Sequence, residues 1–251
     1  MAGRSAVEPV IPARQIRCRL TAASSRAPLS CLNQNMTSIL IADDHPLFRA
    51  ALRQAVENSF EDVTIHEVDS LAALEQIGEQ NIPLDVILLD LHMPGTHGFS
   101  GLIYLRGRYP KVPLAIISAT EEVDVIHRAM HFGANGFIPK SATLNTMMDA
   151  LRQISAGQAW LPEDARRVPA PVMPDLSAMQ DRVSSLTPQQ FRVMGMLLEG
   201  LQNKIIAYEL DVSEATIKAH MTAIFRKLGV RNRTQAVLAL KDLAIEPARL
   251  E

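Results

Sequence analysis

The chain has 251 residues, 47% hydrophobic and 21% charged, a composition typical of a globular protein with one large domain or two modest ones. No apolar run reaches the roughly 18 to 20 residues of a membrane helix, so we expect no membrane partner. The net charge of −2 averages an acidic stretch over 36–155, with 15 acidic and 8 basic side chains (−7), and a basic stretch over 184–241, with 4 and 8 (+4). The acidic stretch favours cation binding, and the basic stretch favours binding to phosphate backbones.

Residues 1–35 are rich in Ala, Ser, Pro and Arg and show no periodicity. They contain both cysteines of the chain, Cys18 and Cys31, so a disulfide framework is excluded for the remainder. A reducing compartment fits this pattern, and we expect a cytoplasmic protein. The composition is also compatible with an organelle transit peptide. We favour a disordered or non-native N-terminal extension over 1–35, because Met36 directly precedes the first apolar run.

Five short apolar runs alternate with helical patterns between residues 36 and 157, at 38–42, 63–68, 84–89, 112–118 and 136–139. Continuous apolarity indicates strands buried on both faces, as in a parallel sheet. The alternation predicts an α/β doubly wound domain with a five-stranded parallel sheet. Ligand sites in such domains lie at the carboxyl ends of the strands.

Polar side chains stand at these carboxyl ends: Asp43, Asp44, Asp90, Ser118 and Lys140. Taken singly, each has an ordinary explanation as a helix cap, a turn residue or a solvated charge. Three carboxylates on one rim would repel each other by on the order of 4 kcal/mol per close pair at an effective dielectric of about 20. A bound divalent cation reverses this cost, and Mg²⁺ prefers oxygen ligands, so the cluster predicts a Mg²⁺ site.

Four motifs carry a family resemblance: IADDHP at 41–46, LDLHMPG at 89–95, ISA at 117–119 and FIPK at 137–140. Together they resemble the flavodoxin-like receiver domain of two-component response regulators. The resemblance implies that Asp90 accepts a phosphoryl group from a sensor histidine kinase, by in-line transfer. It also implies roles for the neighbouring residues: Mg²⁺ held by Asp43, Asp44, Asp90 and the main-chain carbonyl of His92, and phosphoryl stabilisation and switching by Ser118, Lys140 and Phe137. The position of Phe137 is often a tyrosine in this family, so the phenolic hydrogen bond is lost here.

Residues 158–183 contain Pro162, Pro169, Pro171 and Pro174 with few periodic apolar positions. This composition predicts a semi-extended, proline-rich linker between two domains.

Helix signals resume at Thr187, which is followed by Pro188 and by Gln190 at the capping-box position. This first helix runs to Leu198, and Gly200 follows it as a stop. A second helix is expected over 204–210, and a third runs from the cap Ser213 to Leu228, with Gly229 beyond its end. A final helix starts near Thr234. The short break between the second and third helices is typical of a helix-turn-helix.

The stretches GLQNKIIA at 200–207, VSEATIKAH at 212–220 and RKLGVRNRTQA at 226–236 resemble the LuxR-type helix-turn-helix domain of NarL/FixJ response regulators, here assigned to 184–251. The resemblance implies that the third helix enters the major groove of double-stranded promoter DNA. The implied DNA-binding residues are Thr216, Lys218 and His220, which would face DNA, and Lys204, Lys227, Arg231 and Arg233 nearer the phosphates. The last helix would form a dimer contact. This chain has Gln189-Gln190 where the family usually has a charged pair, so an ion pair made by that glutamate is lost.

Both halves together predict a DNA-binding transcriptional response regulator that is phosphorylated at Asp90, acts as a homodimer and has RNA polymerase as a candidate partner. The pattern resembles bacterial activators of alcohol or glycerol catabolism in particular. A phosphorylation-independent regulator remains an alternative. We expect no enzyme: a phosphatase with Asp90 as nucleophile would need a second acid two residues later, where His92 stands.

Overall fold

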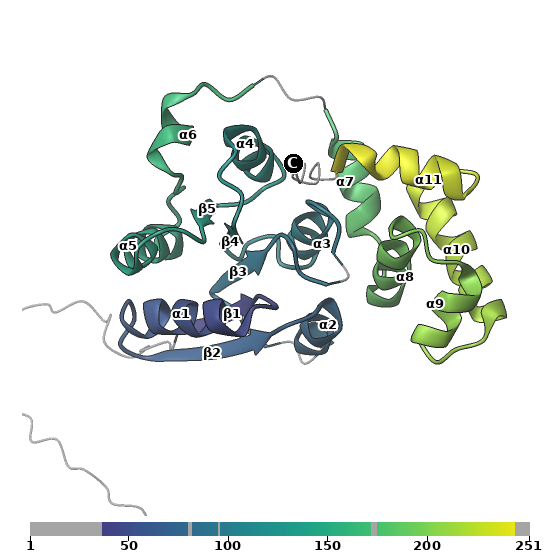
Figure 1. The fold of residues 1–251 in the computed structure, drawn as a ribbon, viewed down its shortest axis with the longest axis horizontal. Helices are drawn as coiled ribbons and strands as arrows, with labels where there is room; N and C mark the ends of the chain where they lie inside the picture. The colour runs from purple at the N-terminus through teal and green to yellow at the C-terminus, as the bar shows by residue number, and fades with distance from the viewer. Residues whose placement is uncertain (1–36, 80–81, 95, 172–174, 244–251) are drawn as a thin grey trace, which may run out of the picture. The chain divides into compact units, whose positions relative to one another are not determined.

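The computed structural model describes residues 37–79, 82–94, 96–171 and 175–243 (Figure 1). The expectations for residues 1–35 and for Met36 lie outside these ranges. Strands and helices alternate through the first half: β1 (Thr37–Ala42), α1 (Pro46–Glu57), β2 (Val63–Val68), α2 (Leu71–Glu79), β3 (Val86–Asp90), α3 (Ser100–Arg108), β4 (Leu114–Ser118), α4 (Val123–His131), β5 (Gly136–Pro139) and α5 (Leu144–Ser155).

All five strands are parallel and lie in the order β2-β1-β3-β4-β5, which confirms the predicted doubly wound sheet. Alternate side chains of β1 serve opposite faces: Ile39 packs with α1 and α5, whereas Leu40 packs with the α2, α3 and α4 side. Strand β4 begins at Leu114, two residues later than expected, since Pro113 has no N–H for the strand ladder. The two-sided burial holds the carboxyl ends of the strands in fixed positions.

The second half is helical: α8 (Pro188–Leu198), α9 (Asn203–Glu209), α10 (Glu214–Leu228), α11 (Arg233–Leu240) and a short 3₁₀ turn, η1 (Lys241–Leu243). The expected caps form. Thr187 and Gln190 make a reciprocal capping box, Ser213 accepts a hydrogen bond from the Thr216 N–H, and Gly229 ends α10 with φ +69°. This confirms the predicted small all-α helix-turn-helix domain. No helix in the described ranges is both long and apolar enough to span a membrane.

The linker differs from the expected semi-extended spacer, because it contains α6 (Glu163–Arg167) and α7 (Ser177–Ser184). Its apolar residues supply the physical reason: Ala165 and Val183 are fully buried, so both short helices are fixed by packing against the body of the chain. Pro162 precedes α6 as its N-cap residue, and so it does not interrupt the helix.

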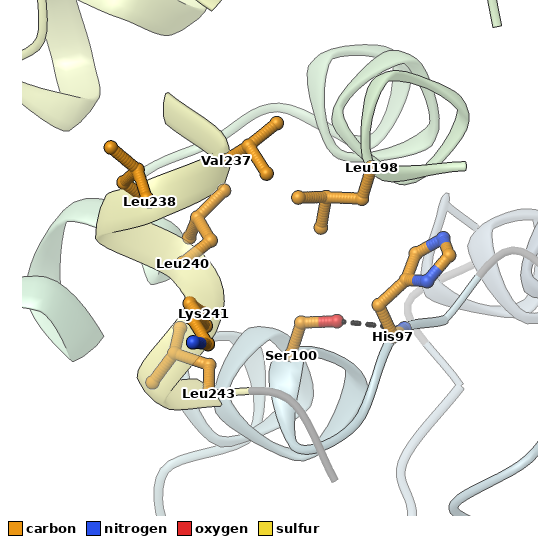
Figure 2. A pocket seen from close by; sticks show the side chains of 8 residues that line it. All are labelled: His97, Ser100, Leu198, Val237, Leu238, Leu240, Lys241 and Leu243. Carbon is orange, nitrogen blue, oxygen red and sulfur yellow. Dashed lines mark hydrogen bonds between the residues drawn. The ribbon is translucent and has the colours of Figure 1, made fainter. Parts of the chain in front are cut away.

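Helix α7 packs on α3, and further apolar and hydrogen-bond contacts join the two halves of the described chain. The ring of Tyr104 on α3 stacks on that of Phe191 on α8, with centroids 4.4 Å apart. The Phe99 N–H donates to the carbonyl of Leu243 at 2.9 Å. A mostly apolar pocket of about 230 Å³ lies here, where Leu198, Val237 and the end of α11 face His97 and Ser100 (Figure 2).

Candidate functional site

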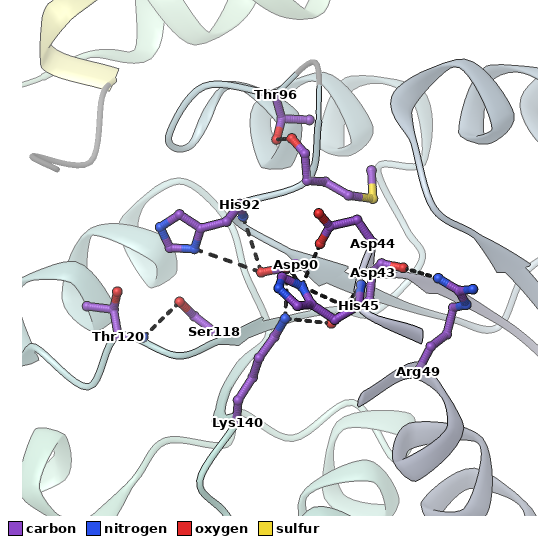
Figure 3. Close-up of polar contacts among 11 residues, drawn as sticks. Asp43, Asp44, His45, Arg49, Asp90, His92, Thr96, Ser118, Thr120 and Lys140 are labelled. Carbon is purple, nitrogen blue, oxygen red and sulfur yellow. Dashed lines mark hydrogen bonds and ion pairs between the residues drawn. The ribbon is translucent and has the colours of Figure 1, made fainter. Parts of the chain in front are cut away.

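The predicted polar residues gather at one edge of the sheet (Figure 3). Strands β1 and β3 are neighbours, so Asp43, which follows β1, meets Asp90, the last residue of β3. Both carboxylates are almost completely buried, with 0% and 1% of the residue exposed, whereas Asp44 is partly exposed. The sheet topology therefore assembles three carboxylates that lie 47 positions apart in the chain at most.

Lys140, which follows β5, bridges the two buried carboxylates. Its Nζ lies 2.8 Å from Asp43 Oδ2 and 2.9 Å from Asp90 Oδ2. Burial disfavours the charged ammonium, but the hydrogen bonds to Asp43 and Asp90 and their negative charges outweigh that effect and raise the pKa of Lys140. The lysine is therefore charged at neutral pH and already oriented toward the atom that would carry a phosphoryl group.

His45 is a member of this cluster that the sequence reasoning did not single out. Its Nδ1 lies 2.7 Å from Asp44 Oδ1, 3.6 Å from Asp43 Oδ1 and 4.0 Å from Asp90 Oδ2. Among the described residues, Asp43, Asp44, His45 and Asp90 form a group whose ligand atoms all lie within 4.8 Å of one another. The signal was in the sequence, because His45 directly follows the aspartate pair.

The donor set fits a divalent cation. Three carboxylates and one ammonium carry a combined charge of −2, which a divalent ion would neutralise, and carboxylate oxygens are the ligands that Mg²⁺ prefers. A pocket of about 710 Å³, lined by Leu47, Phe48, Thr120 and the acidic pair Glu121 and Glu122, opens onto Asp90 and Lys140. An ion and a phosphodonor can thus reach the buried carboxylate from solvent.

The remaining predicted receiver residues surround Asp90. Ser118, at the end of β4, is buried, and its Oγ accepts a hydrogen bond from the Thr120 N–H at 3.2 Å. The backbone N–H of His92 donates to Asp90 Oδ1 at 3.2 Å, which places the His92 main chain at the rim. Phe137 is completely buried inside the sheet and belongs to the apolar cluster on the α3 and α4 side.

The predicted DNA-facing residues divide into two sets. Lys204, Lys218 and Arg231 are exposed, and Thr216 and His220 are partly exposed on α10. The Lys218 ammonium lies 3.0 Å from Glu214 one turn earlier, an exposed pair that DNA phosphates can displace. This face of α10 offers cations and hydrogen-bonding groups to a ligand, whereas Ile217, Met221, Ile224 and Leu228 on its other face are buried.

Lys227 and Arg233 are tied into the helical domain. The Lys227 ammonium donates to the Ser185 carbonyl at 2.7 Å and to Gln190 Oε1 at 2.8 Å. Arg233 donates to the carbonyl of Leu197 at 2.7 Å, at the end of α8. Gln190 therefore supplies a neutral acceptor for Lys227 where a glutamate would have formed an ion pair.

Comparisons with known proteins agree with this architecture. The response regulator receiver domain matches residues 39–152, and the luxR family of bacterial regulatory proteins matches residues 184–240. The glycerol metabolism activator of Pseudomonas putida is 41% identical over 219 residues, which cover 83% of this chain and 96% of that protein. The nitrate/nitrite response regulator NarL of Escherichia coli K12 is 30% identical and covers 82% and 95%. The chain belongs to the NarL/FixJ family of response regulators.

The chain is also similar to solved structures of another response regulator. RcsB from Salmonella enterica serovar Typhimurium, in a structure bound to a promoter, is 23% identical, covers 84% of this chain and 100% of its own, and has a TM-score of 0.49. The NarL/FixJ membership of this chain establishes a transcriptional response regulator with a receiver domain and a LuxR-type DNA-binding domain. The family consists of DNA-binding transcription regulators.

Proposed function

We propose that Asp90 is the phosphoacceptor of this response regulator and that a sensor histidine kinase is the donor. In the reaction, a carboxylate oxygen of Asp90 attacks the phosphorus, the bond from phosphorus to the kinase histidine breaks, and an acyl phosphate forms on Asp90. The observation that carries the proposal is the burial of Asp90 at the end of β3 with the Lys140 ammonium 2.9 Å from its Oδ2. Lys140 and the Ser118 hydroxyl would hold the transferred group by charge and hydrogen bonding.

Asp43, Asp44, Asp90 and the main-chain carbonyl of His92 would hold a Mg²⁺ ion beside Asp90. When bound, the ion supplies positive charge that offsets the repulsion between the carboxylates and the incoming phosphoryl oxygens. Arg49 supports this arrangement by donating to the Asp43 carbonyl at 2.7 Å, and the His45 N–H donates to Asp43 Oδ1 at 2.8 Å. These two hydrogen bonds orient Asp43 without the help of a bound ion.

The phosphorylated protein would bind promoter DNA as a homodimer, with α10 in the major groove. Thr216, Lys218 and His220 would face DNA, and Lys204 and Arg231 would lie nearer the phosphates. The 41% identity to a glycerol metabolism activator supports genes of alcohol or glycerol catabolism as targets, and activation through RNA polymerase. Since its target is promoter DNA, the protein would act in the cytoplasm.

The phosphoacceptor is tested by incubating the purified protein with acetyl phosphate and Mg²⁺ and following the mass of the intact chain. The wild type should gain one phosphoryl group, and Asp90→Asn should gain none because its amide is a poor nucleophile. Asp124→Asn, an exposed aspartate of α4, serves as the matched control and should be labelled like the wild type. Labelling of Asp90→Asn would place the acceptor elsewhere.

A further inference from the structure

We propose that the imidazole of His45 is a ligand of the metal ion in the phosphorylation pocket, by which we mean the pocket that opens onto Asp90 and Lys140. The pocket would then bind divalent ions that accept nitrogen ligands, such as Mn²⁺ and Co²⁺, more tightly than Mg²⁺. This inference deepens the proposed function and rests on it, because it concerns the same ion. It adds one nitrogen ligand to an otherwise oxygen-only set.

The distances carry the first step. Two ligand atoms that each bind one ion at about 2.1 Å lie at most about 4.2 Å apart. His45 Nδ1 satisfies this limit with all three carboxylates, at 2.7, 3.6 and 4.0 Å from Asp44, Asp43 and Asp90. A single ion within bonding distance of the carboxylates therefore meets the imidazole nitrogen with only small side-chain movements.

The local backbone explains why the ring lies there. His45 is the N-cap residue of α1, with φ −88° and ψ 106°, and Pro46 is the first residue of the helix. A proline disfavours helical geometry in the residue before it, so His45 stays extended and its N–H is free to donate to Asp43 Oδ1. The ring then lies among the three carboxylates, with its Nδ1 nearest Asp44 (Figure 3). All the ion pairs of His45 that the described residues form are with these three carboxylates.

The chemistry of the donor set carries the selectivity. An imidazole with its hydrogen on Nε2 has a lone pair on Nδ1. Imidazole binds first-row transition metals well, and their affinities for mixed nitrogen and oxygen sites rise from Mn²⁺ through Co²⁺. Mg²⁺ prefers oxygen and keeps several waters, so it gains little from the ring. His45 would therefore raise the affinity for Mn²⁺ and Co²⁺ relative to that for Mg²⁺, and Mg²⁺ could still bind beside Asp90.

The test compares the full-length wild type with His45→Phe, which keeps a ring but removes the ligand atom. His131→Phe is the matched control, since His131 is exposed at the end of α4, away from the pocket. Calorimetric titrations with Mn²⁺, Co²⁺ and Mg²⁺ should show that His45→Phe weakens Mn²⁺ and Co²⁺ binding by about tenfold or more and changes Mg²⁺ binding by less than about twofold. Pulsed electron paramagnetic resonance of the Mn²⁺ complex should show a nitrogen coupling in the wild type and in His131→Phe, and none in His45→Phe.

Two results would overturn the inference while the proposed function stands. One is an unchanged Mn²⁺ affinity in His45→Phe, and the other is a Mn²⁺ complex of the wild type without nitrogen coupling, each together with normal Mg²⁺-dependent labelling of Asp90 by acetyl phosphate. A wild type that binds none of the three ions and takes no label would overturn the proposed function as well. Circular dichroism of each variant confirms that the fold is retained.

Discussion

Lys140 balances one of the three negative charges that the sheet brings to the pocket beside Asp90. Its ammonium is the nearest cation to both Asp43 and Asp90 in the ion pairs that the described residues form. Without it, two buried carboxylates would face each other in a poorly solvated site. The lysine therefore stabilises the buried carboxylates and lowers the affinity of the pocket for a cation.

The Lys140→Met variant separates these two effects. We expect it to lower the free energy of unfolding by about 1–3 kcal/mol at neutral pH without divalent ions, because the charged hydrogen bonds are lost. The same change should raise the affinity for Mg²⁺ by about tenfold or more, since the pocket charge falls from −2 to −3. Urea denaturation and calorimetric Mg²⁺ titration measure the two quantities. Weaker Mg²⁺ binding in the variant would contradict this electrostatic account.

The difference in the free energy of unfolding between the wild type and Lys140→Met should depend on pH in one direction only. The folded protein raises the pKa of Lys140 above its ordinary value of 10.5, so folding favours the protonated lysine. Its contribution to stability is therefore fully present below about pH 10.5 and is lost as the pH rises through the raised pKa. The stability gap between the wild type and Lys140→Met should stay constant from pH 6 to 9, measured by urea denaturation. A gap that closes within this range would point to another group.

At the scale of elements, α10 combines an exposed side, which we propose to face DNA, with a last turn that is bonded to the rest of the helical domain. Lys218 lies on the exposed side and pairs with the exposed Glu214, whereas Lys227 in the last turn donates hydrogen bonds to Ser185 and Gln190. Two lysines of one helix thus have different surroundings, which the sequence alone does not distinguish.

Substituting each lysine should reveal this division. Lys227→Met should lower the free energy of unfolding by about 1–2 kcal/mol, because a carbonyl and an amide oxygen lose a charged donor. Lys218→Met should change stability by less than about 0.5 kcal/mol but weaken binding to a duplex selected from a random-sequence pool by the phosphorylated protein. Chemical denaturation and fluorescence anisotropy at fixed salt provide the two measurements. Equal effects of both variants on stability would refute the division.

The helices, strands and site contacts were only partly predictable from the sequence. The sheet and the caps at Thr187 and Ser213 were predictable, because burial on both faces and capping chemistry leave local signatures. The rim of carboxylates followed from the topology of a parallel sheet. The ring position of His45 and the partners of Lys227 were not predictable, since both depend on side-chain directions and tertiary contacts. The helices α6 and α7 were missed because proline content masked their few buried residues.

At the scale of the whole molecule, the distribution of positive charge sets how many cations the chain can offer to DNA phosphates. The helical half carries a net +4 over 184–241, but the side chains of Lys227 and Arg233 donate hydrogen bonds to carbonyl and amide oxygens of the same domain. Lys204, Lys218 and Arg231 remain exposed. Of the five predicted DNA-contacting cations, three per protomer are therefore available, so a dimer would offer about six of them to the phosphates rather than ten.

This count predicts the salt dependence of binding. Each neutralised phosphate contributes about −0.9 to the slope of log affinity against log salt concentration, so six contacts give a slope of about −5 and ten give about −9. Between 50 and 200 mM salt, the affinity of the phosphorylated dimer for duplex DNA should fall about a thousandfold. Anisotropy titrations over a salt series measure the slope. A value near −9 would show that Lys227 and Arg233 leave their partners to contact DNA.

Gly107 on α3 lies at the point where this helix crosses α7. A Cβ atom added there would collide with the Cβ of Ser184, so the absence of a side chain lets the two helices touch. Val183 is fully buried beside this crossing, and Ser184 ends α7 only three residues before the cap of α8. A single methyl group at position 107 would act as a wedge, pushing apart the receiver and the start of the DNA-reading module while leaving the chemistry of both untouched.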